Sequence, residues 1–109
     1  MEREKKMTVR IEQIPVDPVP WQEFSVVLNG QNCVISLRQI AERLYADLTV
    51  DDTPIFTGRI CQNGTAVNLY NDKDFTGKLV FADLLGNENP QFEGLGSRWV
   101  LLYGYDDGN

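Results

Sequence analysis

The side chains that most often carry out catalysis are absent from this sequence or scattered along it. Its 109 residues include no histidine, the commonest general base at neutral pH and the commonest metal ligand. Catalysis by a serine or cysteine nucleophile with a histidine partner is therefore excluded. The two cysteines, Cys33 and Cys61, stand far apart, without the Cys-x-x-Cys spacing of a zinc site. We predict no catalytic residue, metal site or cofactor, although a glycosidase-like pair among the scattered carboxylates stays open.

Two segments resemble ion-binding or phosphate-binding loops only in part. Asn71-Asp72-Lys73-Asp74 carries carboxylates like a calcium loop, but it lacks the central glycine and the later glutamate of an EF-hand. Gly94-Leu95-Gly96-Ser97-Arg98 has the glycines of a phosphate loop, yet such loops open a helix and this one leads into an apolar run. We interpret the first as a solvated loop and the second as a tight turn.

Composition and charge limit the class of protein. A chain of 109 residues with 42% hydrophobic and 24% charged residues is typical of one globular domain. The net charge of −6 opposes attraction to a phosphate backbone, so nucleic acid is not an expected partner. No apolar run approaches the ~20 residues of a membrane helix, and we predict no membrane partner. We expect a charged leader at 1–7, a single all-β domain at 8–105 and a short tail at 106–109.

An Asn-Gly pair fixes the register of the first hairpin. Asn29-Gly30 is the preferred centre of a type I′ turn, in which both central residues have positive φ. A two-residue loop here places Leu28 opposite Gln31, and the pairs further along the ladder follow from it. They are Val27 with Asn32, Val26 with Cys33, Ser25 with Val34 and Phe24 with Ile35.

The middle of the chain predicts two further hairpins that conflict in register. Leu44 to Val50 alternates apolar and polar residues, as a half-buried strand does, and Asp51-Asp52 follows as a turn. A second Asn-Gly pair, Asn63-Gly64, predicts another hairpin. In one unbroken strand the two registers would point Ile55 and Ile60 to opposite faces, so we predict a bend near Gly58. The predicted pairs are Leu48 with Ile55, Ala46 with Thr57, Ile60 with Val67 and Cys61 with Ala66.

The remaining segments complete an all-β fold. Strands are predicted at Thr8–Ile14, Lys78–Leu85 and Arg98–Tyr105, and the proline-rich stretch 15–20 is predicted as an extended connector. Ser36–Ala46 is predicted as strand, turn and strand rather than helix. About seven or eight short strands with glycine-marked turns indicate a small antiparallel β-barrel or β-sandwich. Both cysteines lie inside apolar strands, where we expect buried free thiols.

Aromatic residues near the ends of the domain are the candidates for contacts between subunits. They exceed what a core of this size needs, and aromatic residues and arginine are enriched at protein interfaces. The candidate interface residues are Trp21, Tyr45, Arg98, Trp99, Tyr103 and Tyr105.

Several ordered segments together resemble the small baseplate plug proteins of contractile-tailed bacteriophages. The similarity runs from about Ile14 to Tyr103, and the chain departs from the family pattern at Asp52, where a glycine is usual, and at its two ends. The segments are Asn29-Gly30-Gln31-Asn32-Cys33, Arg43-Leu44-Tyr45-Ala46-Asp47-Leu48-Thr49-Val50-Asp51, Thr53-Pro54-Ile55 and Gly94-Leu95-Gly96-Ser97-Arg98.

The resemblance implies a non-enzymatic structural protein of the virion. Such a protein would close or line the tail lumen where the tube meets the baseplate hub. Its partners would be the hub, the tail tube and copies of itself, with no small-molecule substrate, and it would be assembled in the host cytoplasm. A different class of function remains open from the residues alone. Tyr45 and the loops of a small barrel would suit a module that binds an oligosaccharide or single-stranded nucleic acid.

Overall fold

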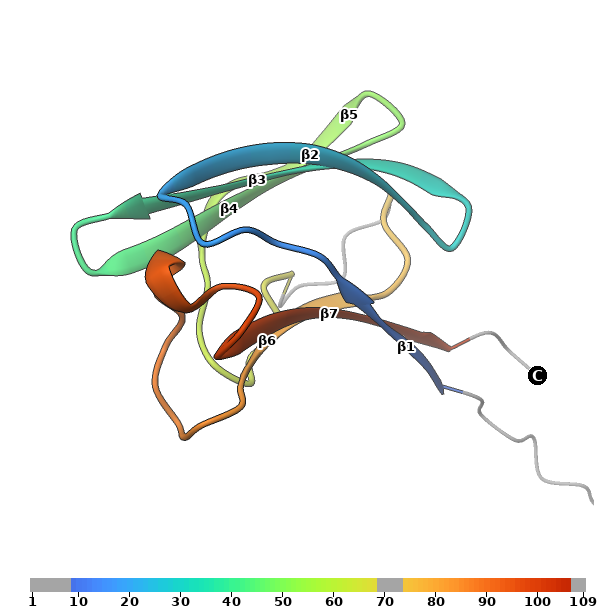
Figure 1. Ribbon diagram of the computed structural model, residues 1–109. Coiled ribbons are helices and arrows are strands. Elements are labelled where there is room, and N and C mark those ends of the chain that lie inside the picture. Colours follow the sequence, from blue (N-terminus) through green and yellow to red (C-terminus); the bar gives the residue numbers. More distant parts are fainter. Residues whose placement is uncertain (1–8, 69–73, 107–109) are drawn as a thin grey trace, which may run out of the picture.

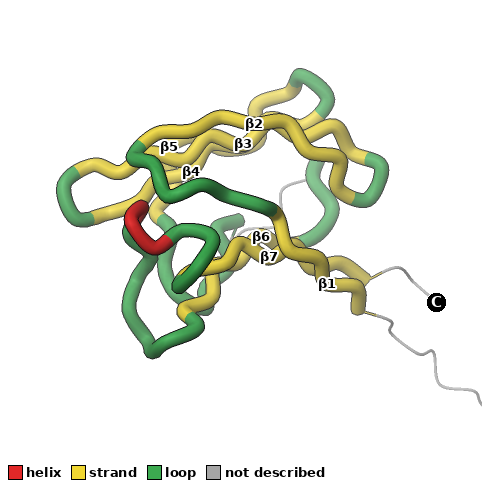
Figure 2. Tube along the Cα trace, viewed as in Figure 1, coloured by secondary structure: helices red, strands yellow, loops and turns green. Residues whose placement is uncertain are grey.

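The computed structural model describes residues 9–68 and 74–106, which form two antiparallel sheets packed face to face (Figures 1 and 2). The predicted leader at 1–7 and residues 107–109 of the predicted tail lie outside the described residues, whereas Asp106 ends the last strand. One sheet has the strand order β1-β7-β6 and the other β2-β3-β4-β5. The elements are β1 (Val9–Ile14), β2 (Trp21–Leu28), β3 (Gln31–Ile40), β4 (Arg43–Val50), β5 (Thr53–Ile60), β6 (Lys78–Asp83), the 3₁₀ turn η1 (Phe92–Gly94) and β7 (Trp99–Asp106).

The all-β prediction is confirmed, and the arrangement is a sandwich. Over the described residues the two sheets do not close into a barrel. The predicted strands at 8–14, 78–85 and 98–105 match β1, β6 and β7 to within two residues where they are described. β3 and β4 meet at a two-residue turn, so the strand-turn-strand interpretation of Ser36–Ala46 is confirmed. The described residues contain no helix long and apolar enough to cross a membrane.

The hairpin between β2 and β3 has the predicted register. Asn29 and Gly30 have φ values of 49° and 75°, as the type I′ turn requires. The ladder runs without interruption from this turn to the start of β2. The confirmed pairs are Leu28–Gln31, Val27–Asn32, Val26–Cys33, Ser25–Val34 and Phe24–Ile35.

The bend predicted in β5 is present as a β-bulge. The register shifts between Ala46 and Leu48 of β4, so that Thr57 and Gly58 together lie opposite Asp47. Gly58 has a φ of 65°, and its N–H donates to Asp47 Oδ1 at 2.6 Å. A glycine is favoured here because other residues rarely adopt this backbone conformation.

A second irregularity in β5 changes the predicted pairs. A shift between Leu48 and Thr49 places Phe56, rather than Ile55, opposite Leu48. Phe56 is buried in the core whereas Ile55 is half-buried, so burial of the larger aromatic side chain decides the register. The predicted pairs Leu48–Ile55 and Ala46–Thr57 are therefore wrong.

The second Asn-Gly pair does not close a hairpin. The N–H of Gly64 donates to Phe81 O at 2.9 Å, and Asn63 Oδ1 accepts from the N–H of Asp83 at 2.8 Å. The segment leaves the four-stranded sheet and bonds to the edge of β6, whose backbone groups would otherwise lack partners on that side. The predicted pairs Ile60–Val67 and Cys61–Ala66 are wrong.

The turn between β4 and β5 holds two aspartates in a conformation that favours glycine. Asp51 and Asp52 have φ values of 49° and 68°. We expect Asp52→Gly to raise the free energy of unfolding by up to about 1 kcal/mol, because the side chain at positive φ is strained. Asp51→Gly should raise the free energy of unfolding less, because it also removes a hydrogen bond: Asp51 Oδ1 accepts from the N–H of Asn32 at 3.2 Å. Urea unfolding of both variants measures the difference, and a less stable Asp52→Gly protein would contradict the prediction.

The two sheets are joined at one end of the sandwich by a hydrogen-bond cluster around Tyr103. The Tyr103 hydroxyl donates to Thr76 O, and Gln31 Nε2 donates to that hydroxyl at 3.2 Å. Gln31 also donates to Leu28 O at 2.9 Å and accepts from the N–H of Thr76 at 2.9 Å. Burial raises the pKa of Tyr103 to about 12, so the hydroxyl stays protonated and donates. The β2–β3 turn is thereby fixed to the three-stranded sheet.

Candidate interaction surfaces

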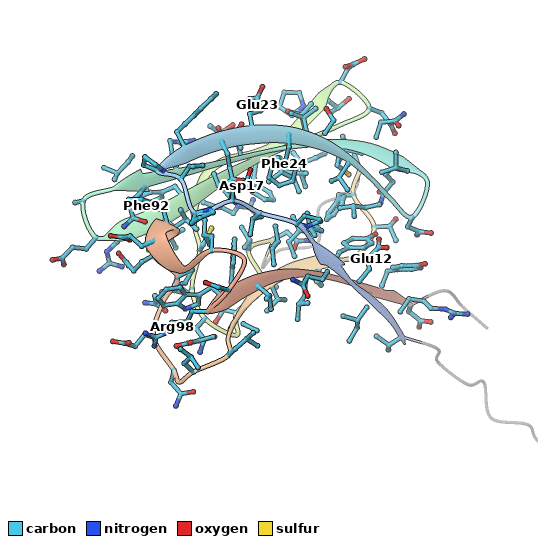
Figure 3. The ribbon with its side chains drawn as sticks, in the orientation of Figure 1. Glu12, Asp17, Glu23, Phe24, Phe92 and Arg98 are labelled. Carbon is cyan, nitrogen blue, oxygen red and sulfur yellow. The ribbon has the colours of Figure 1, made fainter. Side chains whose placement is uncertain are left out.

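The outer face of the four-stranded sheet presents two of the predicted interface residues. Trp21 pairs with Arg38, Arg38 with Tyr45, and Tyr45 with Ile60, so the four form one row across all four strands. Trp21 is 62% exposed and Tyr45 is half-buried. Figure 3 shows the alternation that creates this face, with Glu23 and Phe24 on opposite sides of β2. We call Trp21, Arg38, Tyr45 and Ile60 the aromatic row.

The cation at the centre of the aromatic row is held in place. Arg38 Nη1 lies 2.8 Å from Asp47 Oδ2, and the two side chains are 29% and 31% exposed. The other oxygen of Asp47 accepts from the N–H of Gly58 in the β5 bulge. The bulge therefore holds the Asp47 carboxylate in place, and this carboxylate in turn holds Arg38. A held arginine between two aromatic side chains is the composition found at protein interfaces.

Arg98 is the centre of a second, larger network. Its Nε and Nη2 each lie 2.8 Å from one oxygen of Asp83, and Nη2 also lies 2.7 Å from Glu88 Oε2. The guanidinium stacks over the ring of Trp99 at 4.4 Å. The Asp83 side chain is 0% exposed. The hydrogen bonds from Arg98 hold the pKa of Asp83 well below its ordinary range, and those same bonds raise the pKa of Arg98.

Asp83 also organises the loop that follows β6. Its carboxylate accepts from the N–H groups of Leu85 and Glu88, at 3.0 and 2.9 Å. Trp99 Nε1 donates to Glu88 O at 3.0 Å and holds the far side of the loop. The side chains of Leu84 and Leu85 are nevertheless 59% and 77% exposed. Two apolar side chains in water on a fixed backbone are a second feature suited to contact with another protein.

The Gly94-Leu95-Gly96-Ser97-Arg98 segment is the turn that positions Arg98. The N–H of Arg98 donates to Gly94 O at 2.9 Å, which closes the turn. Gly96 has a φ of 87°, and a side-chain carbon there would lie 2.6 Å from Val16 O. The glycines therefore allow close backbone packing, and the interpretation as a tight turn is confirmed.

We call Arg98, Asp83, Glu88 and Trp99 the Asp83 network. Because Arg98 holds the Asp83 carboxylate in this network, the stability of the fold in acid depends on Arg98. A carboxylate with a depressed pKa in the folded state contributes stability above its ordinary pKa of 3.8, and this contribution is lost as the pH falls below it. We expect Arg98→Met to be less stable than the parent near neutral pH. The difference in free energy of unfolding between the parent and the variant should narrow as the pH falls from about 4 to about 2. Urea unfolding across this range measures it, with Arg43→Met as the control for an exposed arginine. A difference that stays constant with pH would contradict the prediction.

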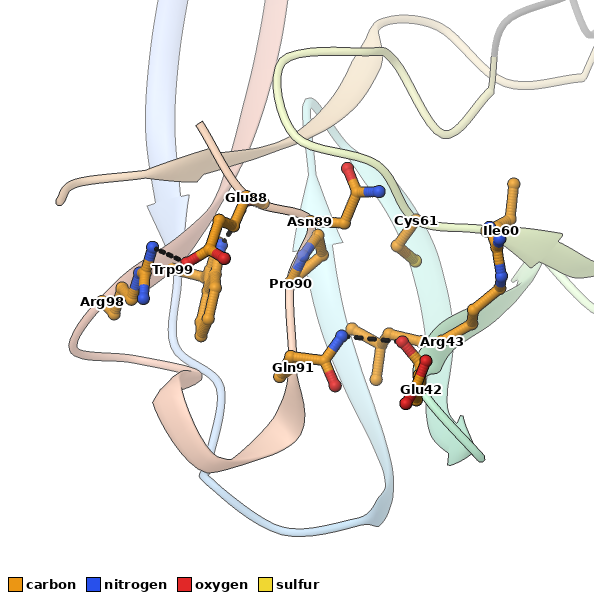
Figure 4. Close-up of a pocket in the computed structure, with 11 residues that line it drawn as sticks. Glu42, Arg43, Ile60, Cys61, Glu88, Asn89, Pro90, Gln91, Arg98 and Trp99 are labelled. Atoms are coloured by element: carbon orange, nitrogen blue, oxygen red, sulfur yellow. Dashed lines mark hydrogen bonds and ion pairs between the residues drawn. The ribbon is translucent and has the colours of Figure 1, made fainter. Parts of the chain in front are cut away.

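A pocket of about 520 Å³ lies between the start of β4, the end of β5 and the loop after β6 (Figure 4). Arg98 and Trp99 line one side. Its polar groups largely satisfy one another: Gln91 Nε2 donates to Glu42 O at 2.7 Å, and Arg98 pairs with Glu88. We assign no ligand to the pocket, because Arg98 and Glu88, two of the four charged residues that line it, already pair with each other.

The other predicted interface residues lie mainly inside the domain. Tyr103 is 0% exposed and Trp99 5% exposed, and their side chains pack in the core. Tyr105 and Arg98 are half-buried, and the Tyr105 ring stacks on Tyr103 with centroids 5.4 Å apart. Asp83 was not predicted as a functional residue. It could have been found as an aspartate at the end of an apolar strand, because aspartate there often bonds to the backbone of a following turn. Seven further large exposed apolar side chains of the described residues were not among the candidates, namely Val9, Ile11, Val19, Val27, Ile40, Leu84 and Leu85.

The cysteines are buried free thiols, as predicted. Burial raises the pKa of Cys33 to about 11 and that of Cys61 to about 12, so neither is an activated nucleophile. No group of three or more acidic or cysteine ligands gathers within residues 9–68 and 74–106. The possible calcium-like run begins at Asn71, and its first three residues lie outside the described ones.

A family model described as cyanophage baseplate Pam3 plug gp18 matches residues 11–106. The chain belongs to this family. The match begins within β1 and ends at the last residue of β7, so the baseplate plug family includes nearly the whole described sandwich. The resemblance to baseplate plug proteins is thereby confirmed. No curated protein matches the chain.

Membership in the baseplate plug family gives the chain a structural role in the tail baseplate of a phage virion, in contact with other baseplate proteins. Two of the four segments that carried the resemblance have structural explanations. Asn29-Gly30 forms a type I′ turn, and Gln31 beside it bonds to Tyr103. The Gly-Leu-Gly-Ser-Arg segment positions Arg98 over Trp99.

Proposed function

We propose that the protein is a non-enzymatic plug that closes or lines the tail lumen at the tube-hub junction of a contractile tail. The observation that carries the proposal is the match to a baseplate plug family over residues 11–106. The fold is compatible with it, because a small sandwich with turns fixed by side chains is a rigid body. Such a body presents surfaces to neighbours without ordering costs on assembly.

The proposed contacts of the plug use the outer face of the four-stranded sheet. Trp21 is the most exposed large aromatic candidate, and Tyr45 lies in the same row with Arg38 between them. We assign these side chains to direct contact with the hub, the tube or another copy. Arg98, Trp99, Tyr103 and Tyr105 then act from inside, by holding the loops and sheets in place.

The location is tested by a cryo-electron microscopy map of virions in the extended state. We expect the two sheets of the sandwich to fit density near the tail axis, between the tube and the hub. After contraction this density should move or disappear from the lumen. Density for the chain at the baseplate periphery, or its absence from virions, would overturn the proposal.

The contact residues are tested by assembly with hub complexes. Trp21→Ala and Tyr45→Ala should each weaken binding by more than about tenfold, since exposed aromatics dominate interface energies. Tyr105→Ala tests whether the edge of the core also takes part. Val19→Ala is the matched control, because Val19 is an exposed apolar residue, at 38%, outside the aromatic row. If both aromatic variants assemble as well as the control, this face is not the contact.

A further inference from the structure

The edge strand β1 is a regular and open backbone edge of the described sandwich. Within residues 9–68 and 74–106 it pairs with β7 on one side only, in a ladder that runs from Val9 to Ile14 without a bulge. It contains no proline and no lysine, the residues that commonly block edge pairing. The side chains of Val9 and Ile11 are 60% and 67% exposed on its outer face. A regular edge with exposed apolar side chains is a template for another strand.

Two of the other three edge strands are less open than β1, and the third lacks the charge pattern of β1. β5 contains Pro54 and two register shifts, which bend it away from regular pairing. β6 is bonded by the segment after β5, through Gly64 and Val67. β2 is regular, but Glu23 is its only charged residue, so a second β2 could offer it no opposite charge.

The sequence of β1 is complementary to itself in antiparallel orientation. It contains Val9, Arg10, Ile11, Glu12 and Gln13 in that order. Pairing centred on Ile11 places each Arg10 opposite Glu12 of the second copy, and the two Ile11 side chains opposite each other. Opposite charges and apolar side chains in direct cross-strand pairs both stabilise a sheet.

We propose that β1 pairs with β1 of a second copy of this chain, centred on Ile11. The contact joins two three-stranded sheets into one continuous sheet, with the exposed Ile11 side chains covering each other on its outer face. Ile11 already packs beside Gly104, where its Cγ1 lies 3.8 Å from the position of an added side-chain carbon. Figure 1 shows the start of β1 running away from the four-stranded sheet. The pairing does not depend on where in the baseplate the plug sits.

The mass of the purified full chain in solution, measured by sedimentation velocity over a range of concentrations, tests this pairing. The parent should show a monomer–dimer equilibrium. Arg10→Glu creates two like-charged pairs by symmetry and should raise the dissociation constant by about tenfold. Arg43→Glu is the matched control, because it makes the same charge change at an exposed residue outside β1 and should leave the constant unchanged.

A charge exchange separates this register from other modes of association. Glu12→Arg alone should weaken the dimer as Arg10→Glu does, whereas the double variant Arg10→Glu/Glu12→Arg should restore it to within about threefold of the parent. Urea unfolding of each variant confirms that the fold is kept. A parent that stays monomeric overturns the proposal. So does a dimer that responds to Trp21→Ala but not to the charge reversals, or a double variant that remains as weak as the single ones.

Discussion

Replacing Tyr103 by alanine is expected to lower the free energy of unfolding by about 3–5 kcal/mol. The side chain is fully buried between the sheets, and its ring contacts those of Phe75 and Tyr105, with centroids 5.8 and 5.4 Å away. Alanine removes the ring and leaves a cavity that the surrounding strands cannot fill. It also removes the hydroxyl that joins Gln31 to Thr76. Urea or thermal unfolding followed by circular dichroism measures the loss.

Tyr103→Phe separates the packing of the ring from the hydrogen bonds of its hydroxyl. The ring remains, so only about 1 kcal/mol should be lost. Gln31 keeps its bonds to Leu28 and Thr76 in this variant, which limits the loss. If Tyr103→Ala cost no more than Tyr103→Phe, the ring would contribute little, and the assigned core position would be wrong.

Gly96→Ala is expected to destabilise the fold by about 2–5 kcal/mol. The residue has a φ of 87°, and the added methyl carbon would lie 2.6 Å from the backbone oxygen of Val16. Backbone atoms cannot rotate out of the way as a side chain would, so the turn must move. Because this turn positions Arg98, we also expect the hydrogen-bonded ion pair between Arg98 and Asp83 to weaken.

Gly86→Ala is the matched control for this substitution. Gly86 lies in the loop after β6, where an added carbon would meet its nearest neighbours at an ordinary 3.7 Å. Its free energy of unfolding should change by less than about 0.5 kcal/mol. Equal effects at the two glycines would contradict the role assigned to the Gly-Leu-Gly-Ser-Arg turn.

The same two networks connect stability to the proposed role in the baseplate. The cluster around Tyr103 fixes the β2–β3 turn, and the Asp83 network fixes the loop that carries Leu84 and Leu85. The first joins segments far apart in the sequence, and the second joins the loop after β6 to the start of β7. A plug assembled from such units would hold its shape under load, because the turns cannot move independently of the core.

Local chemistry made several parts of the fold predictable from the sequence. Asn29-Gly30 fixed a whole ladder, since a type I′ turn sets the register of the strands it joins. Gly58 predicted the bend, because a glycine between two conflicting registers marks a bulge. The absence of histidine excluded histidine-dependent catalysis, and the ordered motifs predicted the family that the comparison then confirmed.

The tertiary structure decided the features that depend on contacts between distant segments, namely some strand pairings and the burial of individual side chains. Asn63-Gly64 has the same turn chemistry as Asn29-Gly30, yet it bonds to β6 because that edge offers unpaired backbone groups. Residue type alone placed Trp21 and Tyr103 together as interface candidates, but one is exposed and the other buried. Burial depends on how the two sheets stack, and that stacking is set by contacts across the whole chain rather than by neighbouring residues.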